Sequence, residues 1–220
     1  GCVPHIQIHT SAAHSVFVKF GQMDFIYTPP TGFKAIQSNE QPEPTIKNGK
    51  EHFDIYTYTS ASTAADITFT GWEFQPDLVW FKCTSHGSSH RLYDSVRGVN
   101  KGIQSNTANA EGTDTDALNS FDSNGFSLGT GNSDINYDSR SFVAYGWKAG
   151  GTAVSNTNGT ITSSVSANTK AGFSIVSWTG TQTASQTVGH GLTQAPDLVI
   201  YKARNEATNW IVGSSALDAT

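Results

Sequence analysis

The sequence of 220 residues has few charged residues, two cysteines and one methionine. Charged residues make up 14% of the chain and the formal net charge is −5, so we expect no basic surface for nucleic acid or anionic membranes. Cys2 and Cys83 are too few for a disulfide framework or a zinc site, and we expect them to be buried thiols. No apolar run approaches the length of a membrane span.

Glycine, serine, threonine and aromatic residues are abundant where charges are scarce. The chain has 21 glycines, and aromatic residues make up 11% of it. This composition is typical of all-β proteins with many turns. No segment sustains a helical pattern of apolar residues, whereas short alternating segments between turn signals recur along the chain. The sequence therefore predicts an all-β fold built from antiparallel β-sandwich modules of jelly-roll type.

Two stretches of the sequence occur twice at one spacing. Residues 76–82 (PDLVWFK) have a counterpart 120 residues further on, at 196–202 (PDLVIYK). Residues 53–59 match residues 173–179 at the same spacing of 120 residues. Because one spacing holds for both pairs, the sequence predicts a tandem array of one β-rich module.

A polar segment divides the chain. Residues 39–50 contain two prolines and an Asn-Gly turn, as a linker does. The start of the chain has no initiator methionine and no signal peptide and runs directly into a strand pattern, so we expect a piece of a longer polypeptide. The predicted divisions are the C-terminal part of one sandwich at 1–38, the linker at 39–50, a first repeat at 51–171 and the start of a second at 172–220.

Strand signals within the first repeat differ in pattern. Residues 53–59 alternate, with Tyr56 and Tyr58 on one face and Phe53 and Ile55 on the other. Residues 78–81 are apolar without alternation, which predicts a central strand buried on both faces. Further strands are expected at 91–96, 125–129 and 141–148, a mostly loop-like stretch at 100–138, and a last hairpin at 159–165.

Carboxylates do not form a catalytic pattern in this sequence. Glycoside hydrolysis needs two carboxylates that face one bond, and on a sandwich they usually lie on alternate residues of one strand. The sequence also lacks His-Glu-x-x-His and a phosphate-binding glycine loop. We therefore expect no enzymatic activity. The glutamates that fail to alternate are Glu40, Glu43, Glu51, Glu73, Glu111 and Glu206.

An oxygen-rich segment is a candidate cation site. Asp134, Asn136 and Asp138 place carboxylate or amide oxygens at alternate positions, as a calcium loop does, and Asp114 and Asp116 could add oxygens. The segment lacks the glycine and the later glutamate of an EF-hand. The alternative is a polar loop whose side chains cap their own turns. Calcium is the one cofactor that the sequence suggests.

Aromatic rings are candidates for carbohydrate contact, because a pyranose face stacks on a ring. Trp72 and Tyr137 lie in predicted loops and are the favoured candidates. Trp80, Trp147 and Trp178 lie within strand patterns, so we expect them in the core. The alternative for all of them is ordinary packing.

His86, His90 and Arg91 surround a Gly-Ser-rich turn and could hold a receptor or a metal ion. A third metal ligand is missing, and such a segment is otherwise the solvated tip of a hairpin. The second repeat has Glu206 and Trp210 at the positions of the two histidines, so folding of the module does not require them.

Two further polar pairs have structural interpretations. Asp94 and Arg97 are expected to form an ion pair at a strand end. Asp77 recurs as Asp197 at the start of the repeated stretch, where capping of a turn is the simplest role.

Residues 5–36 resemble the C-terminal end of a SPRY domain, in which a strand closes on Phe-Gly-Gln and a Pro-Pro-x-Gly-Phe turn leaves the sandwich. With this segment and its repeats, the chain resembles tail and other virion structural proteins of marine tailed bacteriophages. The resemblance implies a concanavalin-A-like fold and a tendency to form homo-oligomers. Its motifs are YTPPTGFK at 27–34, PDLV at 76–79, LYDSVRG at 92–98, SFDSNGF at 120–126, WKAGG at 147–151 and VGHGL at 188–192.

Two functions are compatible with these features. The first is a virion structural protein of a tail fibre, tail or capsid surface, whose partners are copies of itself and neighbouring virion proteins. The second is a carbohydrate-binding adhesin module that reads glycans of the host surface through loop aromatics and the segment 134–138. A glycan reader needs an exposed ring or pocket, whereas a spacer buries those groups.

Overall fold

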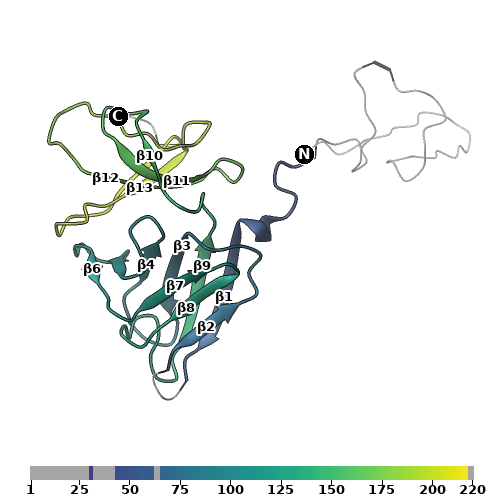
Figure 1. The fold of residues 1–220 in the computed structure, drawn as a ribbon, viewed down its shortest axis with the longest axis vertical. Coiled ribbons are helices and arrows are strands. Elements are labelled where there is room, and N and C mark those ends of the chain that lie inside the picture. The colour runs from purple at the N-terminus through teal and green to yellow at the C-terminus, as the bar shows by residue number, and fades with distance from the viewer. Residues whose placement is uncertain (1–29, 32–42, 62–64, 218–220) are drawn as a thin grey trace, which may run out of the picture. The chain divides into compact units, whose positions relative to one another are not determined.

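The computed structural model describes residues 30–31, 43–61 and 65–217 (Figure 1). The chain divides into two compact units, Gly1–Thr45 and Ile46–Thr220, and this boundary falls within the predicted linker. Apart from residues 30 and 31, the predicted SPRY-like segment 1–38 lies outside the described residues. Cys83 is buried and free, as expected, and Cys2 is not among the described residues.

Two antiparallel sheets form the first repeat, which confirms the predicted all-β fold (Figure 1). A short 3-10 helix, η2 (Gly49–Glu51), precedes them. The larger sheet has the order β1 (Phe53–Thr59), β9 (Ser141–Trp147), β3 (Leu78–Cys83), β4 (Arg91–Asp94), β5 (Lys101–Gln104) and β6 (Gly112–Thr113). The smaller sheet has the order β2 (Ile67–Thr70), β8 (Gly125–Leu128) and β7 (Leu118–Asp122).

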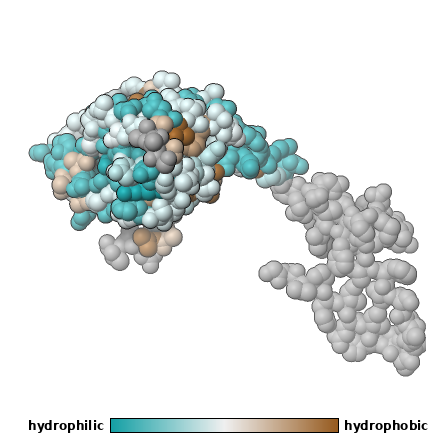
Figure 2. All heavy atoms as spheres, turned by 90° about the horizontal axis from the view of Figure 1, so that it is seen from below, coloured by the Kyte–Doolittle hydropathy of each residue, from teal (hydrophilic) through white to brown (hydrophobic). Residues whose placement is uncertain are grey.

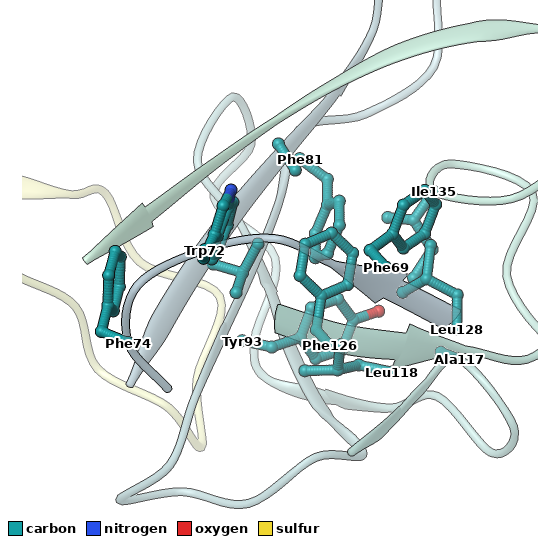
Figure 3. Close-up of a cluster of buried hydrophobic side chains, with 12 residues drawn as sticks. Phe69, Trp72, Phe74, Phe81, Tyr93, Ala117, Leu118, Phe126, Leu128 and Ile135 are labelled. Atoms are coloured by element: carbon teal, nitrogen blue, oxygen red, sulfur yellow. The ribbon is translucent and has the colours of Figure 1, made fainter. Parts of the chain in front are cut away.

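Aromatic side chains fill the space between the two sheets (Figure 3). The ring of Phe126 lies at the centre, with centroid distances of 4.7 Å to Phe69, 5.3 Å to Trp72 and 5.4 Å to Phe81. Burial of each such side chain contributes on the order of 1.5–3 kcal/mol, so this cluster is the main source of stability of the repeat. Tyr58 extends it from β1 and donates a hydrogen bond of 2.6 Å to the carbonyl of Ile135.

The larger sheet is covered on one face only. As predicted, Tyr56 and Tyr58 of β1 face the core, while Phe53 and Ile55 are exposed on the other side. The prediction that β3 is buried on both faces is wrong, because Trp80 is 36% exposed. On that side Trp147 of β9 stacks on Phe173 of the second repeat.

Four strands lie in the stretch 100–138 that was predicted to be mostly loop, three of them unexpected. β5, β6 and β7 occupy it, and only β8 was anticipated there. β5 and β6 are short strands at the sheet edge, and β7 is rich in polar residues. Such strands carry little hydrophobic periodicity, so their pairing is decided by tertiary contacts.

The second copy of the module begins as the repeat spacing predicts. Strands β12, β13 and β14 start 120 residues after β1, β3 and β4, and β13 pairs with β14 in the register that β3 keeps with β4. In place of the predicted hairpin at 159–165, two strands pair and continue into this copy. The bounds are β10 (Val154–Asn156), β11 (Ser163–Asn168), β12 (Phe173–Trp178), β13 (Leu198–Tyr201) and β14 (Ile211–Ser214). The part of the chain that the structure describes holds no helix of the length and hydrophobicity that a membrane crossing requires.

Candidate functional site

Arg91 organises the polar loops at one end of the first repeat. Its guanidinium contacts Asp134 at 2.9 Å and Asp114 at 3.2 Å. Tyr93 donates a hydrogen bond of 2.6 Å to the same Asp114 carboxylate. Burial and this hydrogen bond raise the pKa of the Tyr93 phenol well above its ordinary value, so it remains a donor at neutral pH. The Arg91 guanidinium thereby joins three segments that are distant in sequence.

The three predicted calcium ligands do not form one site. Both carboxylate oxygens of Asp134 accept hydrogen bonds, one from Arg91 and one from the Ser89 amide. Asn136 is buried and donates its side-chain amide to backbone carbonyls, while Asp138 is exposed and bonds the neighbouring Ser139. The Arg91 guanidinium already contacts Asp114 and Asp134, the two acidic side chains that a metal cation would need. Among the described residues, no cluster of three or more His, Cys, Asp or Glu side chains could hold a metal ion.

Two of the predicted ligand-binding residues do come together, at what we call the loop cluster: His86, Ser88, Tyr137 and Arg140. The Ser88 hydroxyl lies 3.2 Å from Nδ1 of His86 and 3.3 Å from the guanidinium of Arg140. Arg140 also lies 4.3 Å from the centroid of the Tyr137 ring, which is 47% exposed. The cluster therefore offers a ring face, a cation and a hydroxyl side by side. Nothing in the sequence pattern had singled out Ser88 or Arg140.

His90 lies two residues after Ser88 in the same loop. Its backbone amide donates a hydrogen bond to Asn106 at 3.0 Å. Desolvation, followed by the charge of Lys82, lowers the pKa of the His90 ring. This shift favours the neutral form of the ring.

Trp72 is not a surface ring, and the prediction that it contacts carbohydrate is wrong. Its side chain is 4% exposed and stacks on Phe74 within the core, at a centroid distance of 5.5 Å (Figure 3). A Cβ atom at Gly146 would lie 2.1 Å from this indole, so the glycine in β9 makes the space for the ring. The loop before β3 folds inward because it closes the end of the core.

Residues 125–129 spell Gly-x-Ser-x-Gly, the spacing of a nucleophile elbow. In an esterase this pattern forms a sharp turn between a strand and a helix. Here Ser127 lies within β8, and its hydroxyl donates to Asp122 at 2.7 Å and lies 3.1 Å from the Thr68 hydroxyl. Neither of these partners is a histidine, and the serine lies inside a strand and not at a strand-to-helix turn.

An apolar surface covers the open face of the larger sheet. The face shown in Figure 2 is mostly hydrophilic or neutral in hydropathy, with hydrophobic atoms confined to small areas. On the open side of the larger sheet, the ring centroids of Trp80 and Tyr145 lie 6.2 Å apart and those of Tyr145 and Trp147 lie 6.5 Å apart. The Trp147 ring lies 5.0 Å from Phe53. The expectation that Trp80 lies in the core is therefore corrected.

Trp178 was also expected in the core but is 37% exposed. It contacts Tyr201 at a centroid distance of 6.2 Å and borders a shallow hollow of about 380 Å³. Its counterpart in the first repeat is Tyr58, which packs on the core. The exposure follows because the described residues place no second sheet on β12 and β13. Hydroxyl side chains line most of the hollow: Ser155, Thr162, Ser163, Ser164, Ser177 and Thr179.

These observations define an all-β protein of antiparallel sheets, consistent with a β-sandwich, with a polar loop cluster and an apolar sheet face. The chain belongs to the family described as domain of unknown function DUF7483, whose match covers residues 48–220. Neither curated proteins nor solved structures match the chain.

Proposed function

We propose that the chain is a structural module of a virion, part of a tail fibre, tail or capsid surface, which acts by assembly and display and catalyses no reaction. The resemblance of its motifs to virion proteins of marine tailed bacteriophages supports this proposal. The observation that carries it is the direct docking of the second repeat on the first. Repeats that bind their neighbours generate length and many weak contacts, as assembly requires.

The docking uses loop residues at which the two repeats differ. The Trp210 indole donates a hydrogen bond of 2.9 Å to the carbonyl of Gln104, and the Glu111 amide donates one of 2.8 Å to the carbonyl of Arg204. Trp210 occupies the position of His90 in the first repeat. The β13–β14 loop thus contacts the neighbouring module, whereas its counterpart in the first repeat, the β3–β4 loop, carries His86 and Ser88 of the loop cluster.

Immunogold electron microscopy tests the proposal. An antibody against residues 46–220 is expected to label intact particles of a phage that encodes the chain. Label at fibre tips would point to receptor contact, and regular label along a shaft or shell to assembly. Particles without label, in a preparation where the antibody detects the denatured protein, would overturn the virion proposal.

Carbohydrate binding is a second candidate, and the exposed Tyr137 ring beside Arg140 favours it. On a glycan array, Tyr137→Ala is expected to weaken binding about threefold to tenfold, because an aromatic contact contributes about 0.5–1.5 kcal/mol. Tyr201→Ala removes an exposed ring of the second copy and serves as the matched control. Equal loss in both variants, or binding that neither variant changes, would contradict glycan reading at the loop cluster.

A further inference from the structure

Seven apolar or aromatic side chains lie on the open side of the larger sheet, and we call this group the outer face; Phe53, Ile55 and Trp80 are its exposed members. They lie in two rows across the strands, because residues paired in register point to the same side. One row joins Phe53, Trp147 and Leu78. The other row joins Ile55, Tyr145, Trp80 and Leu92.

A sheet face that meets water is normally polar. The seven side chains carry no charge, and Lys82, two residues beyond Trp80 on β3, lies on the same side at their border. The nearest acid in register, Asp94 opposite Leu78, is bound by Arg97. Single exposed apolar residues are common, but a contiguous apolar face on a soluble module marks an interaction surface.

The second repeat retains the apolar character of this face. At the matching positions it has Phe173, Ile175, Leu198, Ile200 and Val212. The loop positions diverge in chemistry over the same comparison: His86 is replaced by Glu206 and Arg91 by Ile211. Because this face stays apolar while the loops change, we expect it to bind the same kind of partner in both repeats.

Two details favour a protein partner over a sugar. The position of Trp80 is Ile200 in the second repeat, which retains the apolar surface and loses the ring that a pyranose would need. Also, the outer-face ring of Trp147 already stacks on Phe173 of the second repeat, at 6.3 Å and 26°. Outer-face residues of two modules are therefore in contact within one chain.

We propose that the outer face binds the outer face of a second copy of this chain. Another copy of the module is the partner that both repeats share, and the seven side chains carry no charge that a partner would have to match. Two such sheets can pack face to face with their side chains interdigitated, in an isologous dimer. The inference deepens the proposed assembly function and rests on it, since it names the partner.

Sedimentation velocity of the full chain at increasing concentration tests this contact. The wild-type chain is expected to form a dimer. Ile55→Lys places a charge at the centre of the face, on a residue that is 47% exposed, and is expected to weaken the dimer at least tenfold. Trp80→Lys is a second variant in the same row, and circular dichroism would check that both variants remain folded.

Thr59→Lys is the matched control, because it adds the same charge to an exposed position on the same side of β1, outside the two apolar rows. A dimer that all three variants weaken equally, a dimer that none weakens, or a monomer throughout would each overturn the inference. If the chain were monomeric but the antibody labelled phage particles, the dimer inference would fail and the virion proposal would stand. If the chain formed the dimer but particles carried no label, only the virion proposal would fail.

Discussion

Arg97→Met is expected to lower the free energy of unfolding by about 3–5 kcal/mol, because removing one partner of a buried ion pair leaves uncompensated charge. The guanidinium is 7% exposed and lies 2.5 Å from Asp94 and 3.1 Å from Glu111. It also donates to the carbonyls of Lys101 and Leu92. Methionine keeps the length of the side chain but none of these bonds. Urea unfolding followed by tryptophan fluorescence would measure the loss.

Arg204→Met provides the control, because Arg204 approaches the same Glu111 carboxylate from the second repeat. That contact is 3.8 Å long and the arginine is 43% exposed, so its loss is expected to cost less than about 1 kcal/mol. If the two variants were equally destabilised, burial of the Arg97 network would not be the reason for its effect. This result would also mean that the ion pair of Asp94 and Arg97, predicted at a strand end, stabilises the fold no more than an exposed pair does.

Asp77→Ala is the other variant with a large expected effect. Its carboxylate accepts hydrogen bonds from the Ser95 hydroxyl at 2.9 Å, the Ala149 amide at 2.8 Å and the Gly151 amide at 3.2 Å. Alanine leaves these donors without a partner in a buried position, at a cost of about 3–5 kcal/mol. Asp77→Asn keeps an oxygen for the two amides and is expected to recover more than half of the loss. Thermal unfolding of the three proteins would show this order.

The equivalent residue of the second repeat, Asp197, is the matched position for comparison. It accepts one hydrogen bond, from Ser215 at 2.7 Å, and is exposed. Asp197→Ala is therefore expected to cost less than about 1 kcal/mol. An equal loss at both positions would mean that the turn alone, and not the link to residues 149–151, needs the aspartate.

The sequence predicted those parts of the fold that repetition and alternation encode. The spacing of 120 residues located β12, β13 and β14, and the alternation of β1 assigned Tyr58 to the core and Ile55 to the surface. The sequence could not show that one face of β3 stays open, because an apolar run has the same pattern whether or not a second layer covers it. Only the three-dimensional arrangement shows which layers are present.

The candidate site was predictable in part for a similar reason. His86 and Tyr137 were selected as polar or aromatic loop residues, and both lie in the loop cluster. Trp72 shared those sequence features but turned inward, since the pattern of a short loop does not show which way its ring points. Arg140 had no signal, because its role depends on a ring and a hydroxyl brought to it by separate loops.

The position of β9 between β1 and β3 has a consequence for biosynthesis. Thr59 of β1 pairs with Ser141 of β9, so the middle of the sheet is closed by a strand that leaves the ribosome long after its two neighbours. Until then β1 and β3 have open edges, and such non-local pairing is slow. In a tandem array, a nascent repeat could accept the matching strand of its neighbour, which is the usual misfolding route of repeated domains. Differences in sequence between adjacent copies would then protect the array during translation.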